Sequence, residues 1–210
     1  MTFFGIGTQL LCLSLVLIGA YENLSKGRRS FVYDEDGEGF RENTSAVVTD
    51  GDPTTCLSSY YYKYSYRNKI ALNVDLSMLQ SIYQVDLLKE KGSNIWSVYI
   101  STTDRRENAT QCTRTFAVPD LQRFTCADHG RFVILSLTYG NKSYIKRDPV
   151  CEINVTGCAA GTFGTNCSKH CPKNCVGKIC NILDGKCNMC SEGWKGDHCN
   201  QRTLNIQETV

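Results

Sequence analysis

The sequence predicts an all-β chain, in which a β-sandwich is followed by a small module held together by disulfides. Short runs rich in β-branched and aromatic residues recur along residues 44–157, with polar turns between them. No long stretch has the period of an amphipathic helix. Cysteines are sparse in that region, but eight fall between Cys158 and Cys199. A segment of that size cannot bury an adequate apolar core, so it depends on its bridges.

An apolar run from Leu10 to Ala20 has the length of a signal-peptide core and is too short to span a bilayer. The small residues at its end predict cleavage before Tyr21, although no basic residue precedes the run. A buried N-terminal strand or helix is the alternative. We therefore expect residues 1–20 to be a signal peptide and residues 21–43 a lead-in. No later run is long enough for a membrane span, which predicts a secreted chain.

The cysteine count agrees with export. Of 13 cysteines, Cys12 belongs to the predicted signal peptide, and an even number remains for a disulfide framework. Six sequons predict a glycosylated surface, at Asn23, Asn43, Asn108, Asn141, Asn154 and Asn166. The formal net charge is +2 and no basic block stands out, so nucleic acid is not an expected partner.

The strand pattern is clearest in the runs IALNVDL, IYQVDLL, WSVYIS, RFVILSL and CEINVTG. In the first, Ile70–Leu76, every second residue is apolar, as in a strand with one buried face. In the last, Cys151–Gly157, apolar residues alternate with polar ones, so the sequon at Asn154 faces outward. Many short strands of this kind are typical of a sandwich or jelly roll.

The cysteine-rich segment contains one loop twice, as CAAGTFGTNC and CSEGWKGDHC. Both have the pattern C-x8-C with G-x-x-G inside, and the glycines allow a tight hairpin of the EGF-like kind. Spacing alone leaves many pairings open. The duplication selects Cys158–Cys167, Cys171–Cys180, Cys175–Cys187 and Cys190–Cys199. Residues 158–199 thus resemble the laminin-type EGF-like repeats of multiple-EGF-domain and scavenger-receptor proteins, and residues 200–210 follow as a tail.

Zinc is the alternative role for these cysteines. Cys187 and Cys190 have the C-x2-C spacing of zinc ligands, and His170 or His198 could complete a site. In an oxidising compartment, however, thiols form disulfides. The glycine-containing loops also favour the disulfide interpretation.

Segments of the first region resemble a second family. AVVTDGDPTTC early and VCEINVTGC late, with ALNVDLSMLQSIYQVDLL, IWSVYIS and GRFVILSL between them, are similar to the fucolectin family. That family, also called the fucolectin–tachylectin–pentraxin domain, is the F-type lectin branch of the galactose-binding jelly rolls. The resemblance covers residues 44–157. It implies a galactose-binding-like jelly-roll sandwich, with bridges Cys56–Cys151 and Cys112–Cys126.

The resemblance also implies a bound calcium ion where the early loop meets the last strand. The matching positions are Val47 and Asp52 through backbone oxygens, Asp50 and Glu152 through carboxylates, Thr55 where the family has serine, and Cys151 through its carbonyl. Calcium is a hard cation that prefers such oxygen ligands. The alternative is a plain Asp-Gly turn capped by threonine.

The family's fucose-binding signature is absent. Its histidine, two residues after the first cysteine, is Ser58 here, and the loop LLKEKGSNIW contains no R-x-D pair. Lys89 and Lys91 are either a remnant of that basic site or solvated loop lysines. The neighbouring segment SSYYYKYSYRNK could form a ligand surface or one face of a strand, since tyrosine favours recognition loops. Its leading tyrosines are Tyr60, Tyr61 and Tyr62.

Together these features predict a secreted, non-enzymatic recognition protein of the scavenger-receptor or innate-recognition type, with an extracellular glycan or protein as its ligand. A structural adhesion or matrix protein without glycan binding is one alternative. The truncated ectodomain of a multi-EGF membrane receptor is another. Asp50 and Asp52 could act as a pair of catalytic carboxylates, as in glycosidases, but no catalytic motif accompanies them. An enzyme is therefore not expected.

Overall fold

The computed structural model describes residues 21–34, 42–43, 46–57, 69–91, 95–138 and 149–203. Over these residues the chain is an antiparallel jelly-roll-type β-sandwich followed by a disulfide-rich module, which confirms the predicted fold class. The only helical elements described are two single 3₁₀ turns, η2 (Thr165–Cys167) and η3 (Val176–Lys178). None of the described helices is long and apolar enough to cross a membrane.

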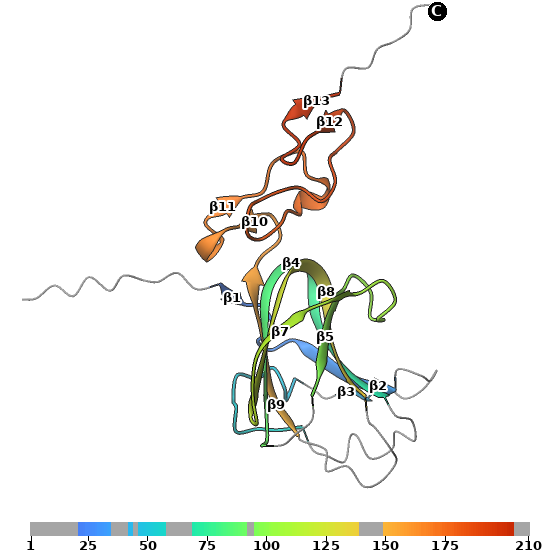
Figure 1. The fold of residues 1–210 in the computed structure, drawn as a ribbon, viewed down its shortest axis with the longest axis vertical. Coiled ribbons are helices and arrows are strands. Elements are labelled where there is room, and N and C mark those ends of the chain that lie inside the picture. Colours follow the sequence, from blue (N-terminus) through green and yellow to red (C-terminus); the bar gives the residue numbers. More distant parts are fainter. Residues whose placement is uncertain are drawn as a thin grey trace, which may run out of the picture.

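Two long strands, β4 (Lys69–Lys89) and β8 (Leu121–Thr138), run through both layers of the sandwich. They arch over the end that faces the cysteine-rich module (Figure 1). The pairing of β4 with β8 shifts register between Asp75 and Gln80, where the strands turn from one layer into the other. The runs IALNVDL and IYQVDLL, predicted as separate strands, are therefore the two halves of β4. A bulge permits this because it increases local twist and bends the sheet.

The remaining strands extend the two layers. In the first layer, β2 (Arg29–Asp34) and then β3 (Glu42–Asn43) continue from β4, while β5 (Ser97–Ser101) and then β6 (Thr110–Gln111) continue from β8. In the second layer, β9 (Val150–Cys158) and then β1 (Glu22–Asn23) continue from β4, and β7 (Thr113–Val118) continues from β8.

The core lies between the layers, where apolar residues at alternate strand positions meet. Ile70, Leu72, Val74 and Leu76 are each no more than 1% exposed, as their spacing predicts. The opposite face of this part of β4 is also buried, which the sequence pattern does not indicate. Ala71 and Asn73 lie on that face, and the side-chain nitrogen of Asn73 donates to the carbonyl of Asp104 at 2.7 Å.

The cysteine-rich module builds the duplicated loop twice with the same geometry. The first copy pairs β10 (Thr162–Phe163) with β11 (Lys169–His170), and the second pairs β12 (Trp194–Lys195) with β13 (Gln201–Arg202). Both glycines of each G-x-x-G motif have positive φ, which explains why glycine stands there. In each copy a basic side chain lies over the aromatic ring, Lys169 over Phe163 and Arg202 over Trp194.

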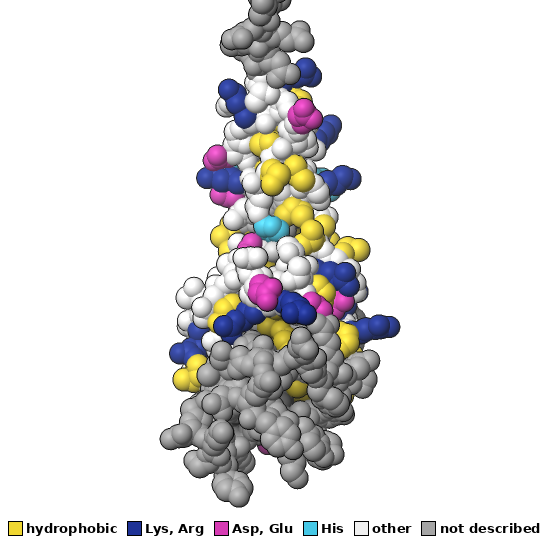
Figure 2. Space-filling model, turned by 90° about the vertical axis from the view of Figure 1, so that its right-hand side faces the viewer, with side chains coloured by type: hydrophobic (Ala, Val, Ile, Leu, Met, Phe, Trp, Pro, Cys, Tyr) yellow, Lys and Arg dark blue, Asp and Glu magenta, His cyan; other side chains and the backbone are white. Residues whose placement is uncertain are grey.

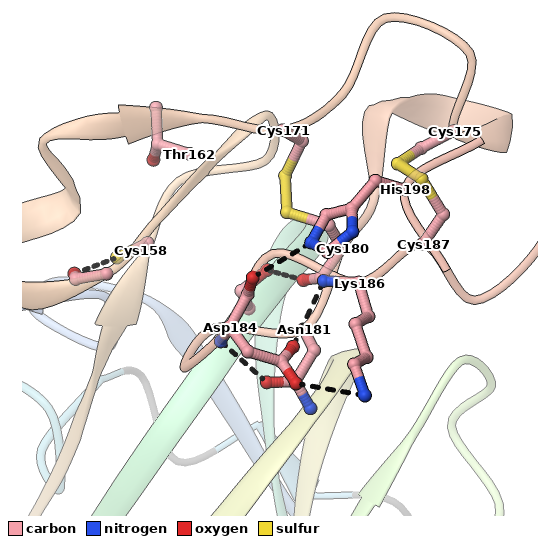
Figure 3. The surroundings of a disulfide bond; sticks show 12 residues. Cys158, Thr162, Cys171, Cys175, Cys180, Asn181, Asp184, Lys186, Cys187 and His198 are labelled. Atoms are coloured by element: carbon pink, nitrogen blue, oxygen red, sulfur yellow. Dashed lines mark hydrogen bonds and ion pairs between the residues drawn. A yellow bond between two sulfur atoms is a disulfide. The ribbon is translucent and has the colours of Figure 1, made fainter. Parts of the chain in front are cut away.

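Exposed polar side chains lie beside the disulfides of the module. Figure 3 shows Asp184, Lys186 and His198 near the bridge between Cys171 and Cys180. The Lys186 ammonium lies 3.8 Å from the Asp184 carboxylate, and Nε2 of His198 lies 3.3 Å from the Asp184 carbonyl. A module with little apolar core is thus tied together by bridges and local polar contacts.

The module continues directly from β9 and contacts the arch of the sandwich (Figure 1). Cys158 is paired with Ser81 of β4, and the Ser81 hydroxyl lies 3.4 Å from the carbonyl of Cys180. The side-chain nitrogen of Asn188 lies 3.0 Å from Nε2 of His129 on β8. These contacts tie the module to the sandwich.

Candidate functional site

Six disulfides join the twelve cysteines of the described chain. The sandwich contains Cys56–Cys151 and Cys112–Cys126, and the module contains Cys158–Cys167, Cys171–Cys180, Cys175–Cys187 and Cys190–Cys199. These are the pairs that the sequence predicts. The zinc alternative is wrong for Cys187 and Cys190, since each sulfur is bonded to another cysteine rather than free as a thiolate ligand.

The predicted calcium residues come together where residues 46–57 run along the edge of β9 that faces away from β4. We call these residues the strap. The amide of Ile153 donates to the carbonyl of Val48 and the amide of Leu57 to the carbonyl of Val150, both at 2.7 Å. Between these contacts, Cys56 is bridged to Cys151. The strap is therefore fixed to β9 on both sides of its turn.

The turn of the strap is organised by its own carboxylates. Asp50 accepts hydrogen bonds from the amide of Asp52 at 2.8 Å and the hydroxyl of Thr55 at 2.7 Å. Asp52 accepts from the amide and hydroxyl of Thr54, and these bonds lower the pKa of its carboxyl. Gly51 between them has a φ of +87°, which suits glycine. These bonds alone describe a capped Asp-Gly turn.

Glu152 does not fit that simpler description. Its side chain projects from β9 beneath the strap and is only 2% exposed. One carboxylate oxygen accepts from the amide of Gly51 at 3.2 Å, while the other is buried without a hydrogen-bond partner. Burial raises the pKa of Glu152 to about 7, and the negative charges of Asp50 and Asp52 raise it further against the effect of the Gly51 amide. A capped turn has no need of this buried carboxylate.

A calcium ion would satisfy this arrangement. Two carboxylates would offset its charge, and neutral oxygens from the strap and from β9 would complete the shell. Val47 and Cys151 lie next to Val48 and Glu152 in the two segments that the strap contacts join. Among the described residues, no group of three or more His, Cys, Asp or Glu side chains converges to hold a metal. An ion at the strap would need backbone and hydroxyl oxygens besides the two carboxylates.

Ser25, which follows β1 by two residues, holds the backbone of β9 next to Glu152. Ser25 is fully buried, and its hydroxyl donates to the carbonyl of Ile153 at 2.8 Å and accepts from the amide of Val155 at 2.9 Å. These bonds fix the backbone of β9 on the C-terminal side of Glu152. The sequence marks Ser25 only as part of a sequon, so this positioning role was not predicted.

The two lysines of the predicted ligand surface have different environments. Lys89 is 3% exposed, and its ammonium donates to the carbonyl of Pro119 at 2.6 Å. Both interpretations of Lys89, as a sugar-binding remnant and as a solvated loop residue, are therefore wrong: β4 extends to this residue and brings its side chain beneath the β7–β8 turn. Lys91 is exposed. Ser58, Tyr60, Tyr61 and Tyr62 lie outside the described residues.

Most of the sequons lie on the described surface. Asn108 and Asn166 are exposed, and Asn23 and Asn154 face each other, with the side-chain nitrogen of Asn23 donating to Oδ1 of Asn154 at 3.0 Å. Asn43 lies in β3. Asn141 is outside the described residues.

No family model matches the chain. Among solved structures, a chitosan-binding module 2 in complex with chitotriose, from a chitosanase/glucanase of Paenibacillus sp. IK-5, is 21% identical, with a TM-score of 0.48 over 64% of this chain and 100% of that one. The C-terminal domain of a Bacteroides fragilis chitobiase is 18% identical, with a TM-score of 0.49 over 66% of this chain and 99% of that one. A fucolectin from Morone saxatilis (striped bass) serum is 17% identical, with a TM-score of 0.46 over 66% of this chain and 48% of that one. With TM-scores below 0.5, these similarities carry no conclusion about the site.

Proposed function

We propose that this chain is a secreted, non-enzymatic recognition protein whose sandwich uses a structural calcium ion to present a glycan-binding surface. The observation that carries the proposal is the buried Glu152 carboxylate, with one unsatisfied oxygen beneath the acidic turn of the strap. Six disulfides support export, because such bridges persist in oxidising compartments.

The calcium ion would act through the strap. The carboxylates of Asp50 and Glu152 would bind it directly, which removes their mutual repulsion and fixes the turn against β9. The strap ends at Leu57, one residue before the tyrosine-rich segment that starts at Ser58. An ordered strap would therefore fix Leu57, the residue that precedes that segment. Ordering a recognition loop before binding reduces the entropy that its ligand must overcome.

A glycan is the proposed ligand class because tyrosine rings offer both an apolar face and a hydroxyl, which matches the two kinds of surface on a sugar. The fucose-type signature is missing, so fucose itself is not proposed. The scavenger-receptor type of recognition is proposed on the resemblance of the duplicated module to that class.

An adhesion protein without glycan binding is the second candidate. The burial of Lys89 favours it, because that burial removes a basic side chain from the surface where a sugar-binding remnant was expected. The two candidates agree on the calcium ion and differ only in the ligand.

A glycan array separates them. The glycosylated protein is applied in calcium and then in EDTA, beside Glu152→Gln and the control Asp197→Asn, which changes an exposed carboxylate of the module. Glycan recognition predicts binding that EDTA and Glu152→Gln abolish and that Asp197→Asn leaves intact. Absence of binding in both conditions would eliminate the glycan function and leave the adhesion candidate.

A further inference from the structure

Within the described ranges, four strands form the edges of the two layers, and their exposed sides differ. The edge strands β1, β3, β6 and β7 each pair with a single strand. Asn23 lies in β1, Asn43 lies in β3, and the sequon that starts at Asn108 ends at Thr110 in β6. The strand β7, Thr113–Val118, contains no sequon. Glycans on the other three edges would cover their free backbone groups, and β7 would stay open.

The side chains of β7 are also suited to contact with another protein strand. All six residues of β7 are exposed, and they include Phe116 at 48% and Val118 at 38% exposure. Among the residues that the structure describes, the strand pairs only with β8, on one side (Figure 1). An exposed edge with apolar side chains is a template for another strand. The register shift at Thr115 leaves Phe116–Val118 as its regular stretch.

We propose that β7 is a self-association edge, where a second copy of this chain pairs antiparallel with it about a two-fold axis at Ala117. In that register Phe116 of each copy lies opposite Val118 of the other, and directly opposed apolar residues on one face stabilise a strand pair. Arg114 of each copy then faces the turn that carries Asp120 of the other. Both charges are exposed, and neither has an ion-pair partner among the described residues, so the edge is complementary to itself.

The occupant is a copy of the same chain because complementarity of charge and apolar contact arises within β7 and the turn that follows it. A two-fold interface brings each residue of such a patch against its counterpart in the other copy. The contact is short compared with a permanent interface, so the dimer forms reversibly at micromolar or higher concentration. This association is separate from the calcium site and does not depend on it.

Glycan insertion tests the edge with one substitution. Thr113→Asn creates a sequon with Thr115 at the start of β7, and Thr113→Gln is the matched control that cannot be glycosylated. The proteins are secreted from glycosylating cells, checked by mass and by thermal unfolding, and compared by sedimentation equilibrium over a concentration series. The wild type and Thr113→Gln form concentration-dependent dimers, and the glycosylated Thr113→Asn stays monomeric. Enzymatic removal of that glycan restores the dimer.

Charge exchange tests the register. Arg114→Asp and Asp120→Arg each weaken the dimer several-fold, and the double variant restores it. A wild type that is monomeric at all concentrations overturns the proposal. A dimer that persists when position 113 is glycosylated also overturns it, because the contact then lies elsewhere. A dimer that is lost with the glycan but indifferent to both charge variants overturns the Ala117-centred register.

Discussion

At the scale of single residues, Glu152 decides between a turn and a metal site. The sequence predicts this residue as a ligand only through a family resemblance. Its pattern predicts an outward side chain, which a strand position alone would leave exposed. The structure retains that direction and buries the carboxylate beneath the strap. The strap contact joins positions about a hundred residues apart in sequence, and strand periodicity contains no information about such contacts.

The raised pKa of Glu152 gives a pH dependence in calcium-free protein. The folded state favours the protonated form of the Glu152 carboxyl. The resulting contribution to the free energy of unfolding is fully present below the ordinary pKa near 4.5 and is lost as pH rises through about 7. We expect the free energy of unfolding in EDTA to fall by roughly 1–3 kcal/mol between pH 5 and pH 7.5. Urea denaturation at the two pH values measures this change.

Two comparisons isolate the effect of Glu152. Glu152→Gln lacks the titrating group, so its stability changes much less across the same interval. Asp128 titrates in a different range: although burial opposes it, hydrogen bonds from His129 and Thr110 lower its pKa to about 2. A wild type as pH-insensitive as Glu152→Gln would contradict the assignment.

At the scale of elements, two features of the long strands could not be predicted. IALNVDL and IYQVDLL each have the alternation of a strand, but nothing in their pattern shows that one bent strand contains both. The first half of β8 and the whole of β7 also lack clear alternation, since β7 is an edge with no buried residue. By contrast, the faces of Ile70–Leu76 follow directly from alternation, because burial between two layers selects apolar residues at every second position.

Gly130 is the position where β5 comes so close to the backbone of β8 that a side chain has no room. A Cβ there would lie 2.5 Å from a methyl carbon of Ile100 and 2.7 Å from the carbonyl of Ser101. We expect Gly130→Ala to destabilise the sandwich by roughly 1–3 kcal/mol, as overpacking does. Thr125→Ala on the same strand is the control. Equal midpoints for the two variants in chemical denaturation would show that the backbone adjusts without cost.

The two sandwich disulfides have separable effects. Cys56–Cys151 spans 95 residues and holds the strap, whereas Cys112–Cys126 spans 14 residues elsewhere in the sandwich. On the chain-entropy model their removal costs about 4–5 and about 3 kcal/mol. Paired Cys→Ala variants, measured by denaturation and calcium titration, should both lose stability, but only the first should lose calcium affinity. Loss of affinity in both would mean that general destabilisation, rather than the strap, controls binding.

At the scale of the whole molecule, the disulfide framework was the most predictable feature and the surface the least. The duplicated loop allows four bridges to be predicted from the sequence, because both copies have the same cysteine and glycine spacing and are therefore closed by the same kind of disulfide. The module surface depends on which face each loop turns outward. Figure 2 shows hydrophobic side chains along one face of the module with basic side chains beside them. Val176 and Met189 of the module are exposed by 46% and 66%, and the Val176 amide donates a hydrogen bond to the Met189 carbonyl.

Calorimetric titration of the calcium-free protein with calcium at pH 7.5 tests the central claim most directly, with Glu152→Gln and Asp50→Asn beside the control Asp197→Asn. We predict one bound ion for the wild type and the control, with a higher Tm in excess calcium because the ion binds only the folded chain. Both site variants should lose binding at least tenfold. A wild type that takes up no calcium, or site variants that bind as tightly as the wild type, would contradict the calcium site and leave the strap a capped turn.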